Sequence, residues 1–146
     1  MLLVGSARSG TTWLARLLAT LPRTLNLFEP LNPNFVPAVR PLYPPGLHTA
    51  RYRPPTVADP AVERLLRHVL QGRVRNGWTD VEAGAWWPRR LLIKEVRAAL
   101  MLGYLSDRFN PRIVFIARHP CAVVASRVAL GFDGSIGELL MQESLV

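Results

Sequence analysis

The sequence is poor in the residues that most often hold metals or form cross-links. Its 146 residues include a single cysteine, Cys121, which excludes a disulfide within the chain and any zinc site built from several cysteines. The three histidines, His48, His68 and His119, are scattered and do not have the spacing of metal ligands. We therefore expect a protein that works without a bound metal.

Long hydrophobic runs are also missing. No stretch of about 18 apolar residues is present, so the sequence predicts no transmembrane segment. The N-terminus, "MLLVGSARSG", lacks the basic region and the long apolar core of a signal peptide, which favours a cytoplasmic protein. The last residues, "MQESLV", carry no signal for the end of a fold, so we expect residues 1–146 to form a single, incomplete domain.

Lysine is almost absent, whereas arginine is abundant. The 18 cationic side chains include one lysine, Lys94, and the net charge is +8. Arginine presents a planar fork that binds phosphate or sulfate with two hydrogen bonds. A GC-rich genome, which favours arginine codons, is the simpler explanation of most of this excess, so only arginines at special positions are candidates for function. No nucleic-acid-binding module is recognisable, and we expect no nucleic acid partner.

Apolar segments that suit buried strands alternate with segments of helical periodicity. Because strand–helix–strand units form right-handed crossovers, this order predicts a three-layer α/β fold, with a central parallel β-sheet flanked by helices as in P-loop NTPases. A proline-rich excursion, residues 30–58, interrupts the alternation, and residues 75–90 are predicted as a loop or a broken helix. The predicted strands are residues 2–5, 24–30, 91–96 and 112–117. The predicted helices are residues 11–21, 59–74, 119–130 and 135–145, with another that follows the third strand as far as Leu105.

Four polar residues fall at or just after the ends of these strands: Arg8, Glu29, Lys94 and Arg118. In open parallel sheets, ligands bind beyond the carboxyl ends of the strands, so we expect these side chains in one site. The agreement of four separate segments makes this edge of the sheet the predicted functional site.

The first of these positions lies in a glycine-rich loop, "GSARSGTT" (5–12). Gly5 and Gly10 have the spacing of a nucleotide-phosphate loop, and the N–H groups at the following helix N-terminus favour an anion. Thr11 stands where that loop carries lysine, and Arg8 provides a cation inside the loop instead. No predicted strand ends in the Asp that a magnesium-dependent NTPase needs. The loop therefore suits a phosphate-like group bound without Mg²⁺, with a P-loop kinase as the alternative.

A second segment, "IARHPCAVVASR" (116–127), carries another candidate anion site. Arg118 stands at the end of the fourth strand, and Ser126 lies about two turns into the helix that begins at Pro120. An arginine fork and a helix hydroxyl can together hold one more phosphate. Ordinary surface and helix-filling roles are the alternative for these two residues.

The segments "SARSGTTWL" and "IARHPCAVVASR" resemble the two signature motifs of the sulfotransferases that use 3′-phosphoadenosine-5′-phosphosulfate (PAPS). The resemblance implies that Arg118 and Ser126 bind the 3′-phosphate and that Trp13 lies near the adenine. Arginine at position 8, where the cytosolic branch usually has lysine, is more similar to the carbohydrate and tyrosylprotein branches. The 5′-phosphosulfate is implied to bind Arg8, Ser9, Gly10, Thr11 and Thr12.

Sulfuryl transfer to a hydroxyl needs a base for the proton and cations for the departing charge. Val96 occupies the position at which the cytosolic branch has its histidine base. Glu29 in "NLFEP" resembles the glutamate of the carbohydrate branch and is the predicted base, with Glu95 as the alternative. The resemblance implies that Lys94 contacts the bridging oxygen or the phosphate. Because side chains alternate along a strand, we expect Lys94 and Glu95 on opposite faces.

The sequence thus predicts a sulfotransferase that moves a sulfuryl group from PAPS to an acceptor hydroxyl, on a glycan or a similar small molecule. The expected catalytic residues are Glu29, Lys94 and Arg8. A kinase-like phosphotransferase is one alternative, and a non-catalytic fragment that binds a nucleotide or an anion is another. The proline-rich excursion follows Glu29 directly, and its candidates for walls of the acceptor site are Tyr43, His48, Arg51, Tyr52 and Arg53.

Overall fold

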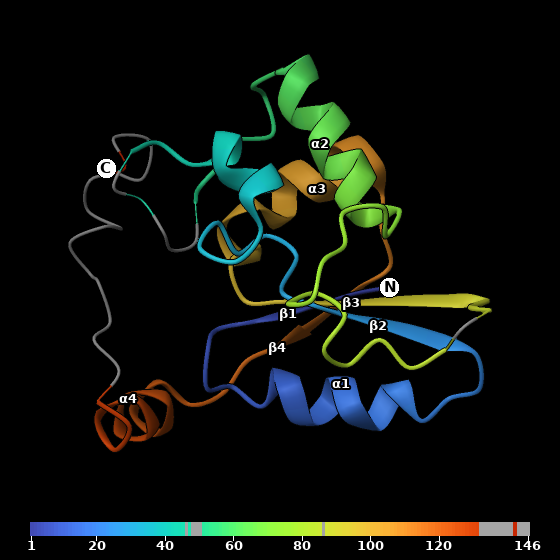
Figure 1. Ribbon diagram of the computed structural model, residues 1–146. Coiled ribbons are helices and arrows are strands. Elements are labelled where there is room, and N and C mark those ends of the chain that lie inside the picture. Colours follow the sequence, from blue (N-terminus) through green and yellow to red (C-terminus); the bar gives the residue numbers. More distant parts are fainter. Residues whose placement is uncertain (46, 48–50, 86, 132–141, 143–146) are drawn as a thin grey trace.

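The computed structural model describes residues 1–45, 47, 51–85, 87–131 and 142 of the chain. The centre of this described part is a parallel sheet of four strands in the order β2-β3-β1-β4 (Figure 1). Strand β1 lies between β3 and β4, with Leu3 beside both Lys94 and Val114. The strands are β1 (Leu2–Gly5), β2 (Thr24–Phe28), β3 (Arg90–Glu95) and β4 (Ile113–Ile116).

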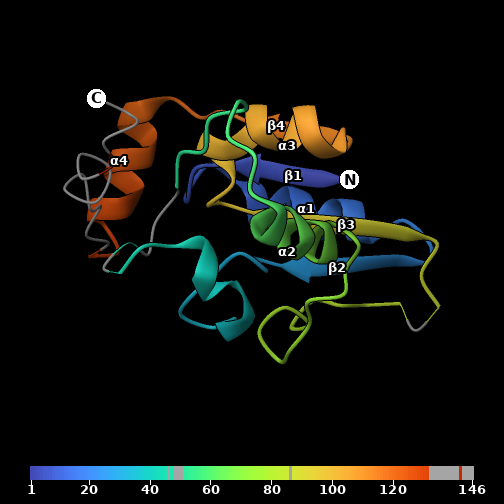
Figure 2. The ribbon, with the colours of Figure 1, turned by 90° about the horizontal axis from the view of Figure 1, so that it is seen from above.

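Helices form the outer layers of the fold. Helix α1 (Thr11–Ala19) covers one face of the sheet, whereas α2 (Pro60–Leu70) and α3 (Leu102–Phe109) cover the other (Figure 1, Figure 2). Helix α4 (Pro120–Val128) follows β4 and lies beyond the edge at which the strands end. Two short 3-10 helices complete the elements, η1 (Pro37–Leu42) and η2 (Ala99–Met101).

Each face of the sheet has its own apolar core. Val4 and Ile93 belong to the larger core, which lies under α2 and α3. Leu3 and Leu92 belong to the smaller one, in which they pack with Ala15 of α1. Neighbouring positions of a strand therefore alternate between the two cores, as the two-residue period of a strand requires.

The predicted α/β fold is confirmed, and the strand segments lie where the sequence places them. Strand β2 is shorter than predicted and ends at Phe28, because Glu29 has a left-handed backbone (φ 42°) that breaks the extended conformation. The helix predicted for residues 59–74 ends at Leu70, shortly before Gly72, whose φ is also positive (70°).

The irregular segments also differ in detail from the prediction. The proline-rich excursion contains η1. Of the segment predicted as a loop or a broken helix, residues 77–82 form turns, and Gly84 forms an isolated bridge with Leu25. The helix after β3 starts as η2 and continues as α3 to Phe109, beyond the predicted end. The helix predicted for residues 135–145 lies outside the described residues, apart from position 142. Within the described part of the chain, no helix has the length and apolar character needed to cross a membrane.

Candidate functional site

The glycine-rich loop connects β1 directly to α1. A Cβ atom at position 5 would lie 2.7 Å from the carbonyl oxygen of Ile116 and 2.7 Å from Ser9 Oγ, so the loop can pass this point only with Gly5. Ser9 is buried, whereas Arg8 at the tip of the loop is exposed and has a left-handed backbone (φ 72°). The loop therefore turns its arginine outward and keeps its serine against the strand.

Helix α1 begins without a side-chain cap. In this fully described helix, the N-cap is Gly10 and no side chain accepts a hydrogen bond from the first turn. The first turn also holds no acidic residue. The leading N–H groups of a helix lack partners inside the helix and carry a partial positive charge. The backbone at Thr11 and Thr12 is therefore suited to a phosphate or sulfate oxygen, as the sequence predicts.

The loop meets the second motif across the end of the sheet. Arg8 Nε donates to Ser126 Oγ at 3.1 Å, and Arg118 Nη1 donates to the carbonyl oxygen of Arg8 at 3.0 Å. Both arginines are exposed, and Ser126 is half-buried. The structure thus brings together three residues that the sequence placed in the anion site. Two guanidinium groups and a hydroxyl therefore converge at one place on the surface of the described part of the chain.

The third part of the site is a cluster of charges around Glu29. Its Oε1 accepts a hydrogen bond from Lys94 Nζ, and its Oε2 accepts one from Arg97 Nη1 at 3.0 Å. Lys94 is only 3% exposed, and its ammonium also lies over the ring of Phe28, 4.3 Å from the ring centre. Glu29 is therefore held between two cations at the end of β2 and β3, close to the surface but not free in solvent.

The sequence did not point to Arg97. It lies two residues after the end of β3, and its place beside Glu29 depends on how the chain turns there. The only sequence signal was its position one residue beyond Val96, where the cytosolic branch has its base. Arg97 joins Lys94 as a second cation on the carboxylate.

Glu95 points to the other side of the sheet from Lys94, as the strand alternation predicts. Its neighbour two positions back, Ile93, belongs to the core under α2 and α3. The side chain is fully buried, and burial followed by the nearby negative charge of Glu29 raises the pKa of Glu95. Its oxygens accept three backbone N–H groups, from Leu31 at 2.7 Å and from Val96 and Arg97 at 2.9 Å each. Glu95 is therefore closed off from solvent, whereas Glu29 is 13% exposed and lies nearer the surface.

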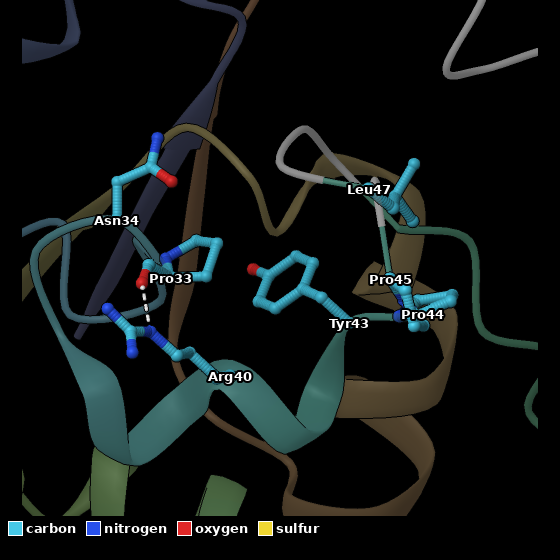
Figure 3. A pocket seen from close by; sticks show the side chains of 7 residues that line it. All are labelled: Pro33, Asn34, Arg40, Tyr43, Pro44, Pro45 and Leu47. Carbon is cyan, nitrogen blue, oxygen red and sulfur yellow. Dashed lines mark hydrogen bonds between the residues drawn. The ribbon is translucent and has the colours of Figure 1, made fainter.

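A cavity of about 350 Å³ lies in the proline-rich excursion, close to Glu29 in the chain (Figure 3). The ring of Tyr43 lies across it, and the Tyr43 hydroxyl donates to the carbonyl oxygen of Leu31 at 2.6 Å. Arg40 Nε donates to the carbonyl oxygen of Pro33 at 3.1 Å, and its guanidinium makes no other hydrogen bond to a described residue. The lining residues are Pro33, Asn34, Arg40, Tyr43, Pro44, Pro45 and Leu47.

The excursion residues predicted as walls behave differently from one another. Tyr43 lines the cavity. Arg53 does not, because it is 7% exposed, pairs with Asp59 at 3.8 Å and lies over the ring of Tyr104. Arg51 donates to the carbonyl oxygen of Leu42. The backbone N–H of Tyr52 donates to Gln142, whereas His48 lies outside the described residues. Trp13, predicted near the adenine, presents an exposed ring in the first turn of α1.

Among the described residues, no group of three His, Cys, Asp or Glu side chains is placed to hold a metal ion. The family model described as the sulfotransferase family matches residues 1–139. The chain therefore belongs to the sulfotransferase family. Searches of curated proteins and of solved structures found no match.

Proposed function

We propose that this protein transfers a sulfuryl group from PAPS to a hydroxyl of a carbohydrate or a similar acceptor. The observation that carries the proposal is the contact between Arg8 and Ser126, which joins the two predicted anion-binding segments into one site. Family membership supports the type of reaction. The donor, the acceptor and the residue roles are our inference from the geometry.

The donor would bind along the edge at which the strands end. The N-terminus of α1 and Arg8 suit the 5′-phosphosulfate, because both offer donors to a compact anion. Arg118 and Ser126 suit the 3′-phosphate at the other end of the same site. Arg8 already contacts Ser126, so its guanidinium must turn toward the sulfate when both phosphates are present.

The chemical step is an in-line displacement at sulfur. The acceptor oxygen forms a bond to sulfur, the bridging S–O bond breaks, and the bisphosphate leaves with the charge. Glu29 takes the acceptor proton, because each carboxylate oxygen has two lone pairs and the ion pairs use only one of each. Protonation of Glu29 weakens its hold on Lys94, which then stabilises the charge that develops on the bridging oxygen.

The cavity beside Tyr43 is the proposed acceptor site. It lies in the segment that follows Glu29, and it combines the faces of several prolines and a tyrosine with the cation of Arg40. The cytosolic branch usually has lysine at the position of Arg8 and has histidine at the position of Val96. These two differences favour the carbohydrate or tyrosylprotein branches. These branches use a glutamate base, which agrees with the position of Glu29.

The direct test is to incubate the protein with PAPS labelled at sulfur and a panel of glycans and tyrosine peptides. The proposal expects label on an acceptor hydroxyl and release of 3′-phosphoadenosine-5′-phosphate (PAP). Transfer of phosphate from MgATP instead would establish the kinase alternative. Tight PAP binding with no transfer to any acceptor would establish a non-catalytic binding module.

A further inference from the structure

The turn that carries Glu29 has an uncommon backbone. Glu29 adopts a left-handed conformation (φ 42°), which is costly for a residue with a side chain, and Pro30 follows it. The backbone N–H of Glu29 donates to the carbonyl oxygen of Lys94 at 2.8 Å, which fastens the start of the turn to β3. Because this conformation is not intrinsically favoured, surrounding contacts must hold it.

Leu31 is held from both sides by buried side chains. Its N–H donates to Glu95 Oε2 at 2.7 Å, and its carbonyl oxygen accepts from the Tyr43 hydroxyl at 2.6 Å. Leu31 is 2% exposed, Glu95 is fully buried and Tyr43 is 9% exposed. A hydrogen bond to a buried carboxylate is stronger than one between neutral groups. Both polar groups of the residue two positions after Glu29 are thus fixed.

The other oxygen of Glu95 holds the turn after β3. Glu95 Oε1 accepts from the N–H groups of Val96 and Arg97 at 2.9 Å each. One carboxylate therefore joins the turn that carries Glu29 to the turn that carries Arg97. Glu29 and Arg97 themselves form an ion pair at 3.0 Å, so a second contact joins the same two turns.

We propose that Glu95 is a positioning residue, whose two oxygens fix the Glu29 turn against the Arg97 turn and so aim the Glu29 carboxylate at the acceptor. Tyr43 completes the arrangement. It binds the same Leu31 and lines the cavity, so the wall of the proposed acceptor site is connected to the base through one residue. The effect on turnover rests on the proposed function, whereas the effect on the two turns does not.

The fixed geometry is tested without any substrate, by amide hydrogen exchange in Glu95→Gln. Glutamine has one acceptor oxygen in place of two, so either Leu31 or the Val96–Arg97 pair must lose its partner. We expect exchange at one of these sites to rise about tenfold or more, the scale of a lost hydrogen bond to a charged group. The amide of Leu3 in the central strand should exchange as before. Unchanged exchange at all three turn amides would overturn the proposal.

The catalytic consequence is tested by combining Glu95→Gln with Glu29→Gln. A residue that acts through Glu29 should lower kcat about 10- to 100-fold when Glu29 is present, the range expected for a small misplacement of a reacting group. It should have less than about a twofold effect when Glu29 is already glutamine, since coupled residues are not additive. PAP affinity should stay within about twofold. Tyr43→Phe, which removes only the hydroxyl, should show the same pattern with a smaller effect.

Two outcomes contradict the positioning role. An equal fall in kcat in both backgrounds would show a general structural effect. An inactive Glu95→Gln protein beside an active Glu29→Gln protein would make Glu95 the base. If the wild-type protein neither binds PAP nor transfers a sulfuryl group, the proposed function fails, and amide exchange alone then decides whether Glu95 holds the two turns.

Discussion

Arg8 donates a hydrogen bond to Ser126 across 3.1 Å, although 118 positions separate the two residues in the chain. The contact exists because β1 and β4 are neighbours in the sheet and their carboxyl ends lie side by side. Arg118 strengthens the connection through its hydrogen bond to the carbonyl oxygen of Arg8. Two segments that each suit an anion are thereby parts of one surface.

Glu29→Gln should lower kcat about 10²- to 10⁴-fold, the usual contribution of a general base, while PAP affinity stays unchanged. Glutamine keeps the shape of the side chain and can accept hydrogen bonds from Lys94 and Arg97 only through its one oxygen. Transfer of labelled sulfate measures kcat, and calorimetry measures PAP affinity. Asp107→Asn, which removes an exposed carboxylate on α3, is the control. Full activity in Glu29→Gln would exclude Glu29 as the base.

Lys94→Met should lower the free energy of unfolding by about 1–3 kcal/mol, because Glu29 loses a buried charged partner and keeps only Arg97. Denaturant unfolding measures the change. The matched control is Arg16→Met, which removes the ion pair between Arg16 and Glu82. The side chain of Arg16 is 71% exposed, so this pair lies at the surface. That change should cost less than about 1 kcal/mol, as is usual for surface pairs. Equal losses in the two variants would contradict the buried character of the Lys94 pair.

Gly5→Ala should destabilise the fold and weaken anion binding together. Its Cβ would meet the backbone carbonyl of Ile116 at 2.7 Å, so β4 or the loop would have to shift, at a cost of about 1–3 kcal/mol. Gly77→Ala is the control, since its Cβ would meet nothing within 4 Å. Denaturant unfolding and PAP titration measure the two effects. A stable Gly5→Ala protein with normal PAP affinity would show that the loop is looser than the structure indicates.

Glu95 should make stability depend on pH in an unusual direction. Burial, followed by the charge of Glu29, raises the pKa of Glu95, so the folded state holds this proton more firmly than the unfolded state. The stabilisation that this proton provides is fully present at pH values below the pKa of glutamate in the unfolded chain, about 4.3. It is lost as the pH rises through the higher pKa of the folded state. The unfolding free energy of wild type minus that of Glu95→Gln should therefore fall as pH rises from about 4. A difference that grows with pH would show that the three N–H donors outweigh burial.

The sequence predicted the parts of the site that depend on the ends of strands. Glu29, Lys94 and Arg8 lie where parallel strands finish, and a parallel sheet brings such ends to one edge. Arg97 could not be found in this way, because it lies beyond β3 and its direction is set by the hydrogen bonds of Glu95. The role of Glu95 was equally hidden, since its partner Leu31 is 64 positions away.

The limits of β2 show the same division between local and distant causes. The apolar run of residues 24–28 predicts a strand from its own composition, and the structure has one there. Its end at Phe28 depends on the left-handed backbone of Glu29, which Leu31 and its two buried partners help to hold. The contacts of Leu31 with Glu95 and Tyr43 join distant positions and leave no pattern in neighbouring residues. The strand predicted from the sequence therefore extended too far, to residue 30.

The most direct test of the joined anion site is a calorimetric titration with PAP and with AMP, which lacks the 3′-phosphate. The wild-type protein should bind PAP more tightly than AMP. Arg118→Ala should weaken PAP binding by about 1.5–3 kcal/mol, the scale of a charged hydrogen bond, and leave AMP binding unchanged. Arg112→Ala, which removes another exposed arginine near β4, should bind PAP as the wild type does. Equal affinity of the wild-type protein for PAP and AMP would contradict a 3′-phosphate site at Arg118 and Ser126.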